Sequence, residues 1–412
     1  MPAIVSFADW AEATGPLLLT GPDKFVNAAQ LQNYSWSRFV RGKDFSEIVQ
    51  GGSEIRDELM LDEAQTFSMY QPNDPQTPTM PQVLTRWSSP WRFAVDSYSW
   101  TEEEEALNAG SSYTEDARFQ QYKSLLTKLE MRVQTSIANG MESKWWAAPI
   151  STTMESSSGK EPYSIPTFVN ESTNGLFSQN TASTANDFTT VEGINPTTTG
   201  KTKWRNRVVG YNSTAVKPTS GNSNVINAMD DAYLQLNFRP PAGKEAYFEP
   251  NTWNSIACFT SRKGMLVMTD LLRQGQDWYT MRESPDAAFT GPSYGGMELV
   301  YVPQLDSAQL YKHTTANSGL VTEGNSNGAG IGPRYYLLNA KYLKTVFHKD
   351  KYFVRKPPMS PFNQPFTKTV YINSYFNNVC TARHVHAIIS PGSVAGAFPS
   401  STFTPSAVYS AY

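Results

Sequence analysis

The chain has 412 residues, a formal net charge of −3, charged side chains at 17% of positions and aromatic side chains at 13%. This balance excludes the strongly basic footprint of a nucleic-acid-binding domain. Low charge combined with many Tyr, Trp and Met residues is typical of proteins that form large interfaces, although a Ser/Thr/Asn-rich β protein has a similar composition. Two cysteines, Cys258 and Cys380, make no disulfide framework. No apolar run approaches 18 residues and no signal-peptide pattern opens the chain, so we expect no membrane partner and a cytoplasm-like compartment.

The first hundred residues are expected to lack a core of their own. Prolines and glycines break 1–50 into short pieces, with room for one short helix over 23–33, and we interpret this stretch as an N-terminal arm. Residues 51–105 predict a long β-excursion whose tip carries four prolines between 72 and 81, which exclude regular helix and central strand. Its return arm is rich in β-branched and aromatic residues. Such a ribbon needs a partner surface, in this chain or in another.

One long amphipathic helix is predicted over 115–145. Thr114 is a suitable N-cap, and Glu115 and Asp116 follow in the first turn, where the helix dipole favours negative charge. The run predicts a helix of roughly 45 Å. Apolar residues recur at steps of three and four and form a single stripe: Phe119, Tyr122, Leu126, Leu129, Val133 and Ile137. A helix with one apolar stripe is expected to lie across a surface, with its polar side turned away.

The remainder predicts short β elements interleaved with helices. Residues 150–222 are loop-rich, with strand-like pieces at IPTFVN, FTTVEGI and WRNRVVGYN. A second helix is predicted over 223–239, and a strand, helix and strand follow from NSIACFTS to GGMELVYVPQLD. Another strand, a short helix over 340–346, and one or two long strands near the C-terminus complete the pattern. We therefore predict an α+β fold.

Four patterns resemble chemical sites but favour structural interpretations. GPSYG at 291–295 matches a nucleophile elbow around Ser293, yet a strand rather than a helix follows it. The glycine-rich stretch 324–333 has no GK[ST] and no helix behind it, which indicates a surface loop. Cys380, His384 and His386 are expected on one strand face, without a fourth zinc ligand. The carboxylates at 102–105 predict a solvated helix start. We expect no enzyme and no catalytic, cofactor or metal site.

The ordered elements resemble the major capsid protein of tailed bacteriophages, which has the Hong Kong 97-type fold. The resemblance rests on EDARFQQYKSLLTKLEMRVQTSIANGMESKWWA, TGKTKWRNRV, NVINAMDDAYLQLNF, FTSRKGMLVMTDLLRQGQDWY with GGMELVYVPQLD, and YYLLNAKYL with YINSYFNNVCTARHVHAIISP. It implies an N-terminal arm (1–50), an extended loop (51–105), a peripheral domain with a spine helix at 115–145 (106–249), an axial domain (250–375) and C-terminal strands with a tail (376–412).

The resemblance also implies a function. Many copies, as hexamers and pentamers, would close into an icosahedral virion shell around double-stranded DNA held non-specifically. Assembly would take place in the host cytoplasm, with scaffolding, portal and decoration proteins as possible partners. The aromatic residues of the extended loop become candidate intersubunit contacts: Trp87, Trp91, Tyr98 and Trp100. The polar side of the spine helix becomes a candidate surface facing the lumen or the solvent: Lys123, Lys128 and Arg132.

Two features of the resemblance do not transfer. No long helical segment precedes the extended loop, so scaffolding is expected to be a separate protein or a segment already removed. No lysine occurs between Lys43 and Lys123, so Lys–Asn cross-links have no donor in the extended loop and we expect a non-covalent shell. Two rival interpretations stay open. One is a β-rich tail or receptor-binding protein that binds carbohydrate through its aromatic residues, and the other is a hydrolase built on Ser293 or a carboxylate pair.

Overall fold

The computed structural model describes part of the chain. The described residues are 46–61, 69, 71, 84–104, 115–147, 154–169, 190–195, 198, 201, 204–211, 225–236, 256–274, 293–294, 297–307, 311–312, 320–321, 333–339 and 342–391. Four stretches discussed above lie outside this set: the short helix considered over 23–33, the tip of the extended loop at 72–82, residues 324–332 of the glycine-rich loop, and the tail after 391. Two compact units are present. In described residues, the first comprises 94–104, 115–141 and 351–374, and all the others belong to the second.

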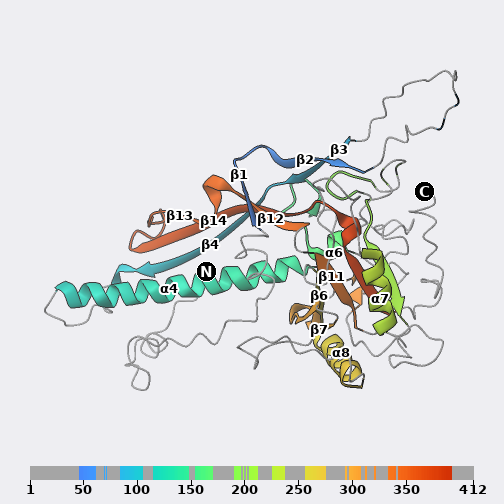
Figure 1. Cartoon of the computed structure of the whole chain (residues 1–412). Coiled ribbons are helices and arrows are strands. Elements are labelled where there is room, and N and C mark those ends of the chain that lie inside the picture. The colour runs from blue at the N-terminus through green and yellow to red at the C-terminus, as the bar shows by residue number, and fades with distance from the viewer. Residues whose placement is uncertain are drawn as a thin grey trace. The chain divides into compact units, whose positions relative to one another are not determined.

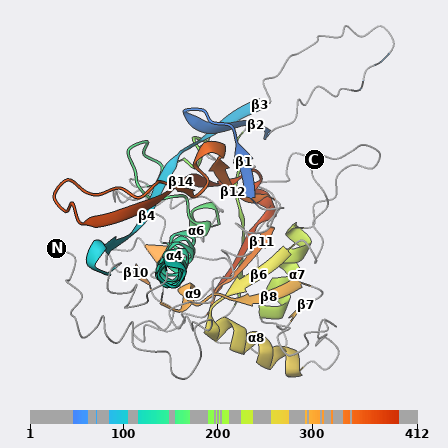
Figure 2. The same cartoon turned by 90° about the vertical axis from the view of Figure 1, so that its left-hand side faces the viewer.

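The first unit is a small sheet packed on a long helix. The predicted helix is confirmed as α4 (Glu115–Trp145), whose residues up to 141 lie in this unit. The sheet has β14 (Thr367–Cys380) between β4 (Arg92–Thr101) and β13 (Val354–Arg355). Figures 1 and 2 show these strands running beside α4. The described part of the predicted stripe contacts the sheet through Leu126, Leu129, Val133 and Ile137, against Tyr98, Trp100, Val370 and Ile372.

The largest part of the second unit is a six-stranded mixed sheet in the order β5-β15-β11-β6-β8-β7. Its strands are β5 (Arg207–Tyr211), β15 (Ala387–Pro391), β11 (Tyr335–Asn339), β6 (Ile256–Thr260), β8 (Met297–Tyr301) and β7 (Ser293–Tyr294). The pairs β6–β8 and β5–β15 are parallel, and the other neighbours are antiparallel. β6 and β11 are buried along their whole length, as expected for strands covered on both faces.

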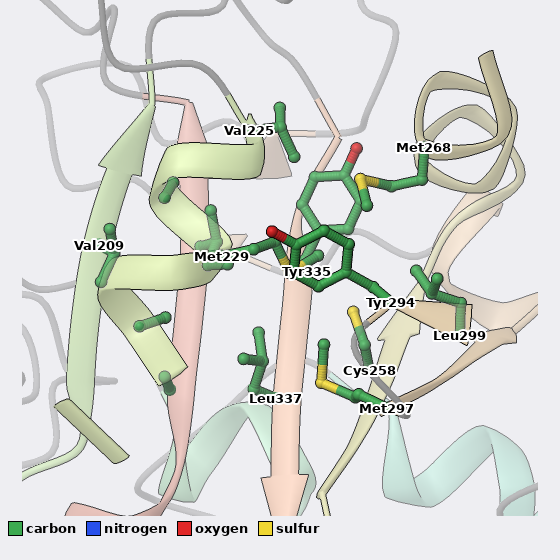
Figure 3. Packing of buried hydrophobic residues seen from close by; sticks show 14 of the residues in the cluster. Val209, Val225, Met229, Cys258, Met268, Tyr294, Met297, Leu299, Tyr335 and Leu337 are labelled. Carbon is green, nitrogen blue, oxygen red and sulfur yellow. The ribbon is translucent and has the colours of Figure 1, made fainter. Parts of the chain in front are cut away.

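Two predicted helices cover one face of this sheet. They are α7 (Val225–Leu236) and α8 (Arg262–Gln274). Figure 3 shows Met229 of α7 and Met268 of α8 directed towards the same part of the core, around Tyr335. Strand alternation sends Cys258 and Leu337 into this core and sends Phe259 and Tyr336 to the opposite face. On that face the Trp146 ring lies 5.7 Å from the Phe259 ring and 5.5 Å from the Tyr336 ring.

Gly264 allows α8 to approach the sheet closely. A Cβ atom at this position would lie 1.9 Å from Thr260 Oγ1 and 3.1 Å from Pro333 Cβ. Thr260 Oγ1 is itself held by a hydrogen bond of 2.8 Å that it donates to the Arg334 carbonyl. The first turn of α8 therefore rests on β6 with no room for a side chain.

A second group of strands in the same unit anchors a hairpin. β1 (Ser46–Val49) pairs in parallel with β12 (Leu343–His348), and β12 pairs antiparallel with the C-terminal half of β14. β2 (Glu54–Met60) and β3 (Leu84–Pro90) form the two described arms of the predicted extended loop. The remaining described elements are short: α6 (Ile165–Phe168), α9 (Gln304–Ser307), β9 (Tyr311–Lys312), β10 (Leu320–Val321), η2 (Lys349–Lys351) and η3 (Arg383–Val385).

Two adjacent asparagines of β14 connect distant parts of this unit. Asn377 Oδ1 accepts from Tyr163 N at 3.0 Å, and Asn377 Nδ2 donates to Pro90 O at 2.7 Å. Asn378 Oδ1 accepts from Trp145 Nε1 at 2.8 Å and from the Thr345 hydroxyl at 2.9 Å. Both asparagines are buried, so each amide replaces the water that it loses with partners from other segments.

Three local predictions are wrong. A short helix was expected over 340–346, but in the described part of this range residues 343–346 begin β12, in which β-branched and aromatic residues pair with β14. IPTFVN, expected as a strand, contains the helical turn α6, with its proline in the first turn, where a missing N–H costs nothing. The return arm of the extended loop is divided at Trp91, because β3 pairs with β2 whereas β4 pairs with β14.

Candidate interaction surface

Exposed apolar side chains concentrate in the first unit. Most lie just before or on β13, on the N-terminal half of β14, or on the connection between these strands. We call this set the arm surface: Tyr352, Val354, Met359, Phe362, Phe366 and Tyr371. Phe362 is fully exposed, and Phe366 is 67% exposed. Large exposed apolar groups cost solvation free energy unless a partner covers them, so a cluster of this kind marks an interaction site.

The local sequence holds the arm surface outwards. The connection KPPMSPFNQPF has four prolines, which fix φ and remove backbone donors. Its first part still pairs with β14. Lys356 N donates to Tyr371 O at 2.8 Å, and Met359 and Thr369 exchange two backbone hydrogen bonds of 2.9 and 2.8 Å. Two tight turns close the far end, through Gln364 N to Pro361 O and Thr367 N to Gln364 O. The apolar side chains are therefore carried on a paired backbone.

The charges around the arm surface are separated by sign. Residues 351–374 contain four cationic side chains, Lys351, Arg355, Lys356 and Lys368, and no Asp or Glu. Arg355 is paired with Glu130 of α4, and its guanidinium lies 5.8 Å from the centre of the Tyr98 ring.

An acidic corner lies at the end of β4. Glu102 and Glu103 are exposed, and Glu102 N donates to Phe366 O at 3.0 Å. Glu104 closes a capping box with Thr101 through bonds of 3.0 and 3.1 Å, so the expected solvated helix start is present in the described residues 102–104. The first unit thus places a basic apolar arm beside an acidic corner.

The aromatic residues expected to contact another subunit are buried in their own chain. Exposed fractions are 3% for Trp87, 8% for Trp91, 4% for Tyr98 and 2% for Trp100. The premise of that prediction, an aromatic ribbon without a local core, is therefore wrong. Trp87 is buried on β3, and alternation along β4 turns Tyr98 and Trp100 inwards and Phe93 and Val95 outwards. Trp91 lies at the break between the two strands and is buried there. That the four rings contact another subunit therefore stays a prediction, and it no longer rests on the lack of a local core.

Trp91 closes the base of the hairpin. Its Nε1 donates to Gly52 O at 2.9 Å, and its ring meets the His348 ring edge-on at 5.5 Å. Gly51 and Gly52 have φ of +107° and +119°, values that favour glycine, where the chain enters β2.

Trp91→Ala is consequently expected to destabilise the protomer itself. Removing this ring leaves a cavity beside Ile55 and Val379, and a Trp→Ala change in a core costs about 3–5 kcal/mol. Urea unfolding of the isolated protomer measures the loss. If the Trp91→Ala protomer were as stable as the unmodified protein, the result would contradict a core role for Trp91 and favour the intersubunit contact.

The basic face predicted on α4 is described in part. Arg132 is exposed and Lys128 is half-buried, while Lys123 lies in the helix at a position whose side chain is outside the described set. These three residues stay candidates for a surface that faces the lumen or the solvent.

The chemical motifs do not assemble into a described site. Ser293 belongs to β7, which forms a tight hairpin with β8 and not the strand–turn–helix of a nucleophile elbow. The chain turns through η3 after Cys380, so the prediction that Cys380, His384 and His386 share one strand face is wrong. His386 is buried, accepts from Asn339 N at 3.2 Å, and burial lowers its pKa to about 3. Burial also disfavours the charged form of Cys380, so it raises the pKa of this thiol.

The described residues contain neither a metal-binding cluster nor a membrane-spanning helix. No group of three or more His, Cys, Asp or Glu side chains is placed to hold a metal ion. No helix combines the length and apolar character that crossing a membrane requires.

Comparison with known proteins assigns the fold. No family model and no curated protein matches the chain. Among solved structures, the capsid asymmetric unit of cyanophage A-1(L) matches 92% of this chain and 98% of its own, at 10% identity and a TM-score of 0.50. The capsid of a native GTA particle (10% identity, 92% and 98% covered, TM-score 0.44) and Mycobacterium phage Bobi (10%, 94% and 99%, 0.44) are further matches.

The chain has an α+β fold of the Hong Kong 97 type, the fold of phage capsid proteins. In particular, it is similar along nearly its whole length to the capsid chain of cyanophage A-1(L). The α+β class and the Hong Kong 97-type fold predicted from the sequence are confirmed. The arm surface was not predicted from the sequence, although a proline-rich run with interspersed Phe and Met residues indicates an exposed, ordered connection.

Proposed function

We propose that this protein is a major capsid protein whose copies assemble into the icosahedral head shell of a bacteriophage around double-stranded DNA. The observation that carries the proposal is the fold match to a phage capsid chain, which covers nearly all of both chains. Function here is structural and needs interfaces, not a catalytic pocket. In this proposal the chain is located in the virion and assembled in the host cytoplasm.

The arm surface supplies a contact suited to this role. A basic arm with exposed Phe362 and Phe366 and an acidic corner with Glu102 and Glu103 are complementary between two copies. A contact between two different patches of identical subunits is heterologous, and it closes into a ring when the rotation is right. Hexamers and pentamers are the rings of the proposed shell. We retain 106–249 as the peripheral domain and 250–375 as the axial domain in this proposal. Contacts, however, group 351–374 with α4.

The DNA contact of the proposed shell is weak and non-specific. Tight binding to phosphates needs clustered Lys and Arg, whereas Lys128 and Arg132 are two cations on one helix face. The absence of lysine between Lys43 and Lys123 supports a shell without covalent cross-links through the extended loop. Scaffolding, portal and decoration proteins complete the set of proposed partners.

Negative-stain electron microscopy of the purified protein tests the proposal. Closed shells, or hexameric and pentameric rings, are the expected result. Stable trimers or monomers that bind glycans would favour the rival receptor-binding function instead. The burial of Trp87, Trp91 and Trp100 already counts against a tryptophan platform for sugars, because such a platform must be open to solvent.

A further inference from the structure

A tight turn at 191–194 joins the extended hairpin to β14. Val191 and Ile194 exchange two backbone hydrogen bonds of 3.1 and 3.0 Å. Between them, Glu192 has φ of +52° and Gly193 has φ of +75°. Left-handed backbone is unfavourable for a glutamate, so contacts around the turn must hold it there. The Glu192 carbonyl accepts from Ser88 N of β3 at 3.0 Å.

The Glu192 side chain makes the second half of this link. Its Oε1 accepts from Cys380 N, at the end of β14, at 3.1 Å. One residue therefore holds β3 through its backbone and β14 through its side chain. Ile194 packs in the same apolar cluster as Trp87 and Val379, so a shift of the turn disturbs the base of the hairpin.

The surroundings of this carboxyl group are poor for a negative charge. Glu192 is completely buried, and its Oε2 has no hydrogen-bond partner. The ionisable groups that face it are Arg383, Cys380 and Tyr163. Burial raises the pKa of Glu192 to about 8, although the hydrogen bond from Cys380 N and, to a smaller extent, the charge of Arg383 oppose this shift.

Arg383 does not neutralise Glu192 by direct contact. Its three guanidinium nitrogens donate to Phe168 O, Trp204 O and Asn206 Oδ1 at 2.9, 3.1 and 3.2 Å. The buried cation is thus solvated by neutral oxygen acceptors, and among the ion pairs of the described residues none joins it to Glu192.

We propose that Glu192 is a proton-dependent latch, which holds the base of the β2–β3 hairpin while it is protonated and releases it on ionisation. An ionised Glu192 must gain water or approach Arg383, and either movement pulls the 191–194 turn away from Ser88. The hairpin then loses its attachment to the end of β14. This device is independent of the proposed capsid function, because it resides within a single chain.

The direction of the pH dependence follows from the raised pKa. We call the form with the hairpin base attached closed and the form with it released open. Between the ordinary pKa range of a carboxyl group and about pH 8, Glu192 is protonated in the closed form and ionised in the open form. Closure is therefore fully favoured below this window and becomes weaker as the pH rises through it. For one proton, the opening equilibrium constant grows about tenfold per pH unit inside the window.

Hydrogen exchange at the Ser88 and Cys380 amides tests the latch in the intact protein between pH 5 and 9. We expect the opening constant, after correction for intrinsic base catalysis, to rise by about tenfold per pH unit and to level off above about pH 8. Glu192→Gln keeps an acceptor for Cys380 N but has no ionisable proton. This variant should therefore show an opening constant independent of pH.

A matched control and a direct probe complete the test. Glu161→Gln removes a carboxylate of the same unit that pairs with Lys144 at the surface, and it should retain the unmodified pH dependence. Difference infrared spectroscopy at pH 7 should show a protonated-carboxyl stretch that Glu192→Gln lacks. A corrected opening constant that does not change with pH, or identical carboxyl bands in the two proteins, would overturn the proposal.

Discussion

Gly264→Ala is expected to destabilise the second unit strongly. The new Cβ would lie 1.9 Å from Thr260 Oγ1. Either α8 withdraws from β6, or the Thr260 hydroxyl rotates and leaves the Arg334 carbonyl without its 2.8 Å hydrogen bond. Overpacking of a core usually costs 1–3 kcal/mol, and an overlap with a fixed neighbour places this change at about 3 kcal/mol or more. Chemical denaturation followed by circular dichroism measures the loss.

Gly140→Ala is the matched control for this change. Gly140 also lies in a helix, α4, but a Cβ there would meet no atom within 4 Å. The substitution should stabilise the protein by about 1 kcal/mol, because alanine is the better helix former. The double variant Gly264→Ala/Thr260→Ala should recover part of the loss, since it removes the nearest clashing atom. Equal stability of the Gly264 and Gly140 variants would contradict the close approach of α8.

Removing the apolar character of the arm surface is expected to abolish assembly while preserving the fold. The triple change Met359→Ser, Phe362→Ser and Phe366→Ser affects side chains that are 55%, 101% and 67% exposed. Their loss therefore costs the isolated protomer little, whereas anchors at the centre of an interface carry most of its binding energy. Analytical ultracentrifugation should show protomers in place of shells, with an unchanged unfolding midpoint.

Leu266→Ser provides the comparison for the triple variant. Leu266 is 62% exposed on α8 in the other unit, so it matches the arm residues in exposure but not in position. We expect this variant to assemble normally. Shells formed by the triple variant, or equal loss of assembly in both proteins, would exclude the arm surface as the site of subunit contact.

Long periodic patterns allowed accurate prediction from the sequence. The stripe of α4 and the apolar faces of α7 and α8 repeat over at least three turns, so their helices were placed within a few residues. Short apolar pieces were less informative. Residues 340–346 include Tyr, Leu, Thr and Val, which suit either a helix or a strand. Pairing with β14 favours the strand β12.

The candidate surface was harder to predict because exposure depends on tertiary pairing. Phe93 and Trp91 differ by two positions in a similar local sequence, yet one is 68% exposed and the other 8% exposed. The break between β3 and β4 at this point changes the pairing partner. The pattern of polar and apolar residues alone does not predict this change of pairing partner. Glu192 gave no signal either, since a lone glutamate in a turn is normally solvated.

The asparagine pair of β14 determines when this chain can complete its fold during synthesis. Asn377 and Asn378 bind groups at positions 90, 145, 163 and 345. Four earlier segments therefore lack these hydrogen-bond partners until β14 has been synthesised. A ribosome must synthesise the chain beyond Asn378 before these buried groups find their partners, and contacts of such sequence separation form slowly. The segments around positions 90, 145, 163 and 345 therefore cannot complete their packing until Asn377 and Asn378 have left the ribosome.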